Sequence, residues 1–414
     1  MSVLHARDDR MHAMNGTLTT SSSAGVPLPA ALLLCAAGIA GSLVACGGRS
    51  VEVPEWIMPV PEGVPTFAYA ATPIDERDAR VGFEADLVIA ARGDDPNYLL
   101  FRPGVVGVSA AREIVLHDEG NGRIQVFDWA GDYLRTIGRP GEGPGEIGRG
   151  GWVALAGERV LWLGSGRLNT WSLDGDFLEA VQHEEGSAGP VAGLDDGSFV
   201  AASLVRDALA PRMEFRGLSA QGAELRRFGS FLTGVSKVIV SSQGLTIVDP
   251  PAPRPAFAAS PDGDIYVTPA AEYQLYALRR SGQMRWAVGV AWPRLPVTEE
   301  DRAAAVLRPV PGVEISGVEW PEQLPALGLP RRRAGSALAL DGHGHLWVFP
   351  LVPSGWEREE LPVDIFSFEG EPLFSGFTPF SDWQAPFGDF VFRVEEDVDS
   401  GEHQVVRYRL VEPF

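Results

Sequence analysis

An all-β fold built from one repeated unit is what the sequence predicts, and three observations lead to it. Short apolar runs alternate with polar residues, as in half-buried antiparallel strands. Tight turns with glycine as their second or third residue separate these runs. The glycine of one such turn recurs at Gly131, Gly175 and Gly222, about 45 residues apart, which suits four strands per unit. We therefore expect a β-propeller, a ring of four-stranded antiparallel blades that leaves few strand edges open.

Six copies of the unit can be followed along the chain. They cover residues 114–137, 160–178, 196–225, 262–282, 341–370 and 390–410. The last copy lacks an outermost strand. Residues 85–90 (ADLVIA) are predicted to supply it, which would close the ring through the N-terminal part of the domain. The sequence therefore predicts six blades, or seven if residues 66–104 form a blade of their own.

A longer gap between the fourth and fifth copies, about residues 290–334, predicts an insertion. Residues 298–301 (TEED) have the form of a helix N-terminus with acidic residues in the first turn. The helix is expected to continue to Leu307 and to end before Pro309. This excursion joins the outer strand of one blade to the inner strand of the next. We therefore expect it on the face of the channel mouth, as a lid.

The N-terminal residues predict the cellular localisation of the protein. Its apolar run, residues 30–44 (AALLLCAAGIAGSLV), has the length of a signal-peptide core and is too short and glycine-rich for a membrane span. The run ends in LVACG, residues 43–47, which resembles the lipobox of bacterial lipoproteins. This resemblance implies that Cys46 becomes the lipid-modified N-terminus. Gly47 after it implies the outer membrane, with the domain facing the periplasm or the cell surface.

The chain divides into three parts on this basis. Residues 1–45 are the predicted signal peptide, 46–65 a tether rich in proline and glycine, and 66–414 the propeller with its insertion.

The repeats also resemble a known family. Residues 123–146 contain RIQVFD, a glycine turn and IGRPGEGPGE, and residues 297–303 and 321–326 add further matches. These segments resemble NHL-type repeats and the bacterial six-bladed β-propeller lipoproteins, over about residues 66–414. The resemblance implies a fold and no particular reaction, because most members of the group have no assigned activity.

Charge and cysteine content exclude several functions. The formal net charge is −21 and Lys237 is the only lysine, so the surface repels phosphate backbones and nucleic acid is not a partner. Cys35 lies in the leader and Cys46 at the lipidation site, which leaves the mature domain without a disulfide or a thiolate metal site. No serine-hydrolase elbow, Walker A, zinc-protease or C-x-x-C pattern occurs.

Two basic motifs could carry chemistry. Arg331, Arg332 and Arg333 could clamp a phosphate or a carboxylate, or could pair with acidic neighbours, which is the favoured interpretation. His343 and His345 could ligate a metal ion from one face of a strand. They fall in an Asp-Gly turn with no third ligand identifiable, so a polar turn is favoured.

Two further motifs give weaker evidence for a functional site. Residues 395–399 (EEDVD) could hold a hard cation such as calcium, but they lack the spacing of a calcium loop, and a solvated hairpin tip is favoured. Residues 143–148 (GPGEIG) match G-x-G-x-x-G, yet they precede a strand and contain a proline where a phosphate needs backbone amides. We interpret them as the bend between two blades.

The leading functional prediction is a lipid-anchored envelope propeller that acts as a binding or scaffold module, and this interpretation is favoured over an enzyme. Its ligand would be a peptide, a glycan or a protein, bound at the channel mouth beneath the insertion. The alternative is an envelope hydrolase or lyase that uses a metal ion in the channel. No cofactor is predicted for the leading interpretation, and calcium is the first ion to consider for the alternative.

Overall fold

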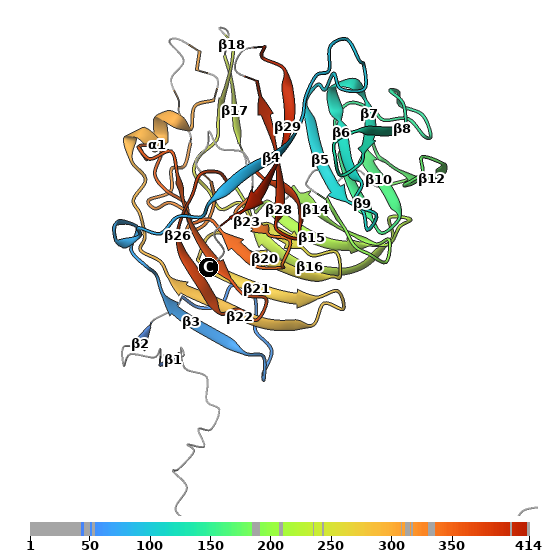
Figure 1. The fold of residues 1–414 in the computed structure, drawn as a ribbon. Helices are drawn as coiled ribbons and strands as arrows, with labels where there is room; N and C mark the ends of the chain where they lie inside the picture. Colours follow the sequence, from blue (N-terminus) through green and yellow to red (C-terminus); the bar gives the residue numbers. More distant parts are fainter. Residues whose placement is uncertain are drawn as a thin grey trace, which may run out of the picture. The chain divides into compact units, whose positions relative to one another are not determined.

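Six antiparallel sheets, the blades of a propeller, make up the computed structural model (Figure 1). The structure describes residues 54–183, 191–206, 210–234, 236–241, 244–307, 309–310, 315, 318–329, 336–397 and 400–411, with two short strands before them, β1 (Leu43–Val44) and β2 (Ser50–Val51). The predicted six-bladed propeller is confirmed.

Each blade takes its second and third strands from one copy of the predicted unit, and its first strand lies before that copy. Blade 1 contains β5 (Pro103–Val108), β6 (Ile114–Asp118), β7 (Arg123–Phe127) and β8 (Tyr133–Ile137); blade 2 contains β9 (Trp152–Ala156), β10 (Arg159–Gly164), β11 (Arg167–Ser172) and β12 (Phe177–Gln182). Blade 3 contains β13 (Val191–Gly193), β14 (Phe199–Val205), β15 (Arg212–Leu218) and β16 (Glu224–Leu232); blade 4 contains β19 (Ala256–Ala259), β20 (Asp264–Thr268), β21 (Gln274–Arg279) and β22 (Met284–Ala291). Blade 5 contains β23 (Leu338–Leu340), β24 (Leu346–Val348), β25 (Leu361–Phe366) and β26 (Pro372–Thr378); blade 6 contains β27 (Gln384–Phe387), β28 (Phe390–Glu396) and β29 (His403–Leu410).

The fourth strand of blade 6 comes from the N-terminal part of the chain. This strand, β4 (Phe83–Ile89), pairs antiparallel with β29, so that Ile89 lies opposite Val405. Figure 1 shows the blue β4 beside the red β29. The prediction that residues 85–90 close the ring is confirmed.

The segment before β4, residues 54–82, runs along the outside of blades 4 and 5; we call it the N-terminal arm. Its strand β3 (Thr66–Ala70) adds to β22 in parallel and becomes a fifth strand of blade 4. After a short 3-10 turn at η1 (Ile74–Glu76), the Val81 amide donates to the Phe377 carbonyl of blade 5. Residues 66–104 therefore form no seventh blade, because their strands complete blades that already exist.

The predicted tether is not free over its last twelve residues. The Ile57 amide donates to the Gln274 side chain at 3.0 Å, and the Met58 amide donates to the Tyr276 hydroxyl at 3.1 Å. Trp56, Met58 and their apolar neighbours pack against the core between blades 3 and 4. Any free tether must therefore end before residue 54.

The hydrophobic core consists of six clusters, one at each blade interface. Trp162 and Trp171 pack between blades 1 and 2, Trp286 between blades 4 and 5, and Trp347 between blades 5 and 6, as expected for packing residues. Each blade is therefore stabilised mainly through its two neighbours, which makes closure of the ring important for stability.

Two elements lie outside the blade pattern. The hairpin of β17 (Lys237–Ser241) and β18 (Gly244–Val248) leaves the ring between blades 3 and 4 and was not predicted. Helix α1 (Glu299–Ala304) begins where predicted, capped by Thr298, but ends three residues early. It ends there because Val306 pairs with Val248 and the Leu307 amide donates to the Ile247 carbonyl, so the chain joins the hairpin instead.

Candidate functional site

A cavity of about 790 Å³ lies on the face of the ring that we call the connection face. This face carries the loops from the last strand of one blade to the first strand of the next, and those between second and third strands. The lining segments lie within residues 249–257, 324–329, 336–339, 351–354 and 381–384, together with separate residues from blades 2 and 3 and with Asp301 and Leu307 of the insertion. A pocket of this size can hold a small molecule or a few residues of a polypeptide.

The walls of the cavity are mainly apolar. Pro250, Pro251 and Pro255 lie in the segment that leads from the hairpin to blade 4. Phe257 and Leu338 come from the innermost strands of blades 4 and 5. These residues offer an apolar surface of defined shape with few hydrogen-bonding groups.

Trp152 is the one large exposed aromatic side chain in the described lining. It begins β9 in blade 2 and remains 42% exposed. Among the described residues its indole N–H has no hydrogen-bond partner. An exposed indole combines a broad apolar face with a polar donor, as in many binding sites.

The acidic side chains of the cavity are already engaged by protein groups. Asp249 pairs with Arg254 at 2.5 Å, and Asp382 pairs with Arg393 at 2.7 Å. Asp301 accepts hydrogen bonds from Thr298 and from the Ser354 amide at 2.8 Å. Burial opposes its ionisation, but these hydrogen bonds outweigh burial and lower the pKa of Asp301. The described lining therefore offers little unmatched charge to a ligand.

The insertion forms a fixed wall of this cavity in the part that the structure describes. The Leu324 amide donates to the Leu295 carbonyl at 2.8 Å, and the Leu327 amide donates to the Ala270 carbonyl at 3.1 Å. The next amide, of Gly328, donates to the Phe349 carbonyl at 3.0 Å. Residues 324–328 are thus bonded to blade 4 and to blade 5.

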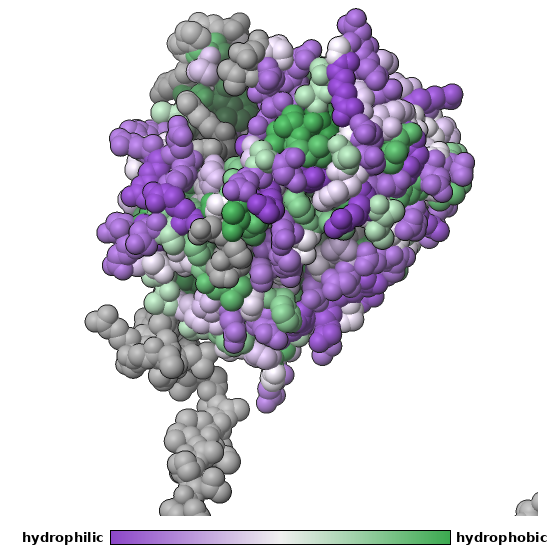
Figure 2. Space-filling model, in the orientation of Figure 1, coloured by the Kyte–Doolittle hydropathy of each residue, from purple (hydrophilic) through white to green (hydrophobic). Residues whose placement is uncertain are grey.

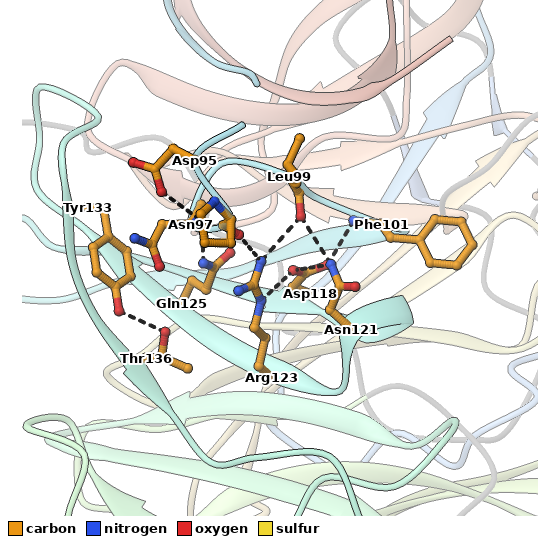
Figure 3. A network of polar contacts seen from close by, with 11 residues as sticks. Asp95, Asn97, Leu99, Phe101, Asp118, Asn121, Arg123, Gln125, Tyr133 and Thr136 are labelled. Atoms are coloured by element: carbon orange, nitrogen blue, oxygen red, sulfur yellow. Dashed lines mark hydrogen bonds and ion pairs between the residues drawn. The ribbon is translucent and has the colours of Figure 1, made fainter. Parts of the chain in front are cut away.

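A buried polar network supports the same face at blade 1 (Figure 3). The Asp118 carboxylate, fully buried, accepts hydrogen bonds from Arg123 and Asn121 at 2.8 Å each and from the Phe101 amide at 2.8 Å. Arg123 also donates to the Pro96 carbonyl at 2.7 Å. The network fixes the connection from blade 6 to blade 1.

Several predicted site residues lie outside the described residues. These are Cys46 and the three arginines Arg331, Arg332 and Arg333, together with the last two positions of the acidic motif at 395–399. Within that motif, Glu395 pairs with Arg393 at 2.9 Å and accepts from the Tyr408 hydroxyl at 2.6 Å.

His343 and His345 lie in the turn between β23 and β24, at the opposite end of those strands from the cavity. His343 bonds Asp389 at 2.7 Å, and His345 bonds the buried Asp341 at 2.8 Å. The two imidazoles therefore turn to different carboxylates. In the described part of the chain, no three His, Cys, Asp or Glu side chains gather as a metal site would require. The role of the histidines as ligands stays a prediction.

Sequence reasoning did not identify the residues that line the cavity. Trp152 is one of eleven tryptophans spread along the chain, and the prolines at 250, 251 and 255 are residue types typical of any connection between strands. Their convergence depends on the order of blades around the ring. The run PPAPRP at 250–255 was the one local signal available.

The visible face of the molecule is mostly hydrophilic with separate hydrophobic patches, as the net charge of −21 leads one to expect (Figure 2). Among the described residues, no helix is long and apolar enough to cross a membrane.

No family model matches the chain, and no curated protein matches it. Among solved structures, the chain is similar to an exported protein of Bacteroides fragilis, with 10% identity, 84% of this chain and 99% of that chain covered, and a TM-score of 0.49. A DUF4221 family member from Bacteroides vulgatus shows 9% identity, 80% and 99% coverage, and a TM-score of 0.46. A gluconolactonase from Xanthomonas campestris shows 14% identity, 74% and 85% coverage, and a TM-score of 0.37. At these identities and TM-scores, the similarities carry no argument about activity.

Proposed function

We propose that this protein is a cell-envelope β-propeller that binds an uncharged, mainly apolar ligand in the cavity of its connection face. The observation that carries the proposal is the cavity of about 790 Å³, in which apolar walls surround the exposed ring of Trp152. Asp249, Asp301 and Asp382 are held by protein donors, so a charged ligand would find few free partners.

The proposal includes a lipid anchor at Cys46 and a place among the NHL-like propeller lipoproteins. The LVACG motif and the repeat segments support these two points. With Cys46→Ser, the protein should move from the membrane fraction to the soluble envelope fraction. Unchanged membrane retention would contradict lipidation at Cys46 and would leave the cavity proposal untouched.

Ligand binding can be tested with Nile red, an uncharged apolar dye whose fluorescence rises in apolar surroundings. We expect saturable binding at one site, weakened about tenfold by Trp152→Ala because its large apolar contact is lost. Phe368→Ala is the matched control, since Phe368 is 47% exposed but lies outside the cavity lining. Equal affinities for the wild type and for Trp152→Ala would overturn the assignment of the site.

The alternative, a metal-dependent hydrolase or lyase, predicts a different result. Purified protein would retain calcium or zinc in a fixed ratio of ion to protein. Removal of the ion would abolish the binding of a substrate in the channel, which is measured by its competition with the dye. Binding is favoured over this alternative because the cavity carboxylates already serve a helix cap and two ion pairs.

A further inference from the structure

The hairpin of β17 and β18 presents an apolar face to solvent. Val238 lies opposite Ile247, and Val240 lies opposite Leu245, so these four side chains share one face of the hairpin. Val238, Val240 and Leu245 are 53%, 77% and 42% exposed. The opposite face contains the buried Thr246 and Val248. The solvent-facing side of the hairpin is therefore apolar, whereas a sheet surface that faces water is ordinarily polar.

This apolar face continues into the cavity. Val306 pairs with Val248, which places Leu307 beside Ile247 and on the same face as Val238. Leu307 is 52% exposed and also lines the cavity. Asp249, the residue after β18, lines the cavity as well. A ligand that covers the hairpin face can therefore reach the cavity at Leu307.

The hairpin also has an open backbone edge. One edge of β18 is occupied by Val306 and Leu307, whereas β17 pairs only with β18 among the described residues. Hydrogen-bonded pairs alternate along an antiparallel ladder, so every second residue of β17 directs its N–H and C=O outward. An open edge of this kind binds another extended strand, and its neighbouring side chains select the sequence.

The chemistry of the occupant follows from these features. A small apolar molecule would leave the backbone edge unused, and a second copy of the chain would bring together two proteins of net charge −21. An extended polypeptide satisfies the backbone edge and the apolar row together. Its charge should be neutral or positive.

We propose that the hairpin face, residues Val238, Val240, Leu245, Ile247 and Leu307, binds an extended polypeptide without net negative charge by strand addition to β17 and directs an uncharged, apolar part of it into the cavity. This inference rests on the proposed function, because it names the ligand class of the same site. The peptide contributes alternate apolar side chains, one row of which covers the hairpin face.

A fluorescein-labelled, end-capped peptide of sequence Thr-Val-Lys-Val-Thr-Val-Lys-Val tests the proposal with the full chain. We expect saturable anisotropy, with affinity reduced roughly fivefold or more by Val240→Thr, which keeps strand propensity but removes apolar contact. Val88→Thr is the control, because Val88 is 48% exposed on the outer strand β4. A peptide with proline in place of the two central residues should not bind, because proline cannot complete the ladder.

Three outcomes would overturn the inference. Equal peptide affinity in Val240→Thr and Val88→Thr would remove the hairpin from the site. Concentration-dependent dimers lost in Val240→Thr would assign the face to a second copy. Binding to phosphatidylethanolamine vesicles by the Cys46→Ser protein, lost in Val240→Thr, would assign it to the lipid surface. In each case, retained Nile red binding that depends on Trp152 would leave the proposed function standing, so the two failures are distinguishable.

Discussion

Arg77 and Asp364 form a buried ion pair, with 2.9 Å between their side chains, that joins the N-terminal arm to the third strand of blade 5. The Tyr273 hydroxyl of blade 4 donates to the same carboxylate at 2.7 Å, and Ser375 donates at 2.6 Å. Burial, followed by the neighbouring Asp364 charge, raises the pKa of Tyr273 far above its ordinary value, so the hydroxyl stays protonated. The Asp364 carboxylate thus joins the arm and blade 4 to blade 5.

Arg77→Met should destabilise the protein by about 3–5 kcal/mol, because removal of one partner leaves the buried Asp364 carboxylate without its cation. Urea unfolding measures the loss. Arg80→Met is the control on the same arm: Arg80 pairs with Glu360 at 2.7 Å, but its side chain is 59% exposed, and the expected loss is below about 1 kcal/mol. Equal losses in the two variants would show that the buried pair does not fix the arm.

Closure of the ring depends on a second ion pair. Asp86 in β4 accepts two hydrogen bonds from Arg407, at 2.8 and 3.0 Å, and the guanidinium stacks 4.0 Å from the Trp129 ring of blade 1. Asp86→Asn should cost about 2 kcal/mol, because Arg407 is largely buried. Glu84→Gln in the same strand breaks an exposed pair with Arg409 and should cost below about 1 kcal/mol. Hydrogen exchange of β4 should rise in the first variant only.

The blades could be predicted because each carries its own local signal. Alternating apolar residues and glycine turns mark strands such as β6, β7 and β8 without knowledge of the rest of the chain. The closing strand β4 could also be predicted, because one repeat visibly lacked a strand. In contrast, β3 is a lone apolar run, and nothing in its periodicity says which blade edge it joins.

The candidate site could not be predicted for the same physical reason. Trp152, Phe257 and Leu338 meet because blades 2, 4 and 5 surround one opening, and strand register decides which side chains face it. The hairpin at 237–248 shows the limit most clearly. Its valines are residues typical of a strand, but nothing in the sequence indicates a hairpin outside the blades whose apolar face points to solvent.

Gly193 marks a position where two inner strands leave no room for a side chain. A Cβ at Gly193 in β13 would overlap the Leu155 carbonyl of β9 in the neighbouring blade. Gly193→Ala should therefore cost about 3 kcal/mol, since neither backbone can move without disturbing its sheet. At Gly104, in inner strand β5, a Cβ would meet only Gln384 at 3.7 Å. Gly104→Ala should be neutral or slightly stabilising in urea unfolding; a loss at Gly104 matching that at Gly193 would contradict the steric explanation.

Asp301 should make the cavity wall sensitive to acid. Its pKa is lowered in the folded protein, so its contribution to stability is complete above the ordinary range of an aspartate and is lost as the pH falls through the lowered value. Asp301→Asn should cost about 1–2 kcal/mol at pH 7, because the Thr298 cap and the Ser354 amide lose a charged acceptor.

The cost of Asp301→Asn should shrink as the pH falls below about 4, because the wild-type carboxyl then becomes protonated in the unfolded chain, and it should vanish once the pH falls below the lowered pKa of the folded state. Urea unfolding of both proteins from pH 7 to pH 3 measures this. Glu299→Gln is the control on the same helix: Glu299 is 89% exposed and should show neither the cost nor the pH dependence. Hydrogen exchange near Ser354 should rise in Asp301→Asn alone, because that carboxylate joins helix α1 to the loop of blade 5 at the edge of the cavity. A loss that is constant with pH would show that the side chain acts through packing and not through its charge.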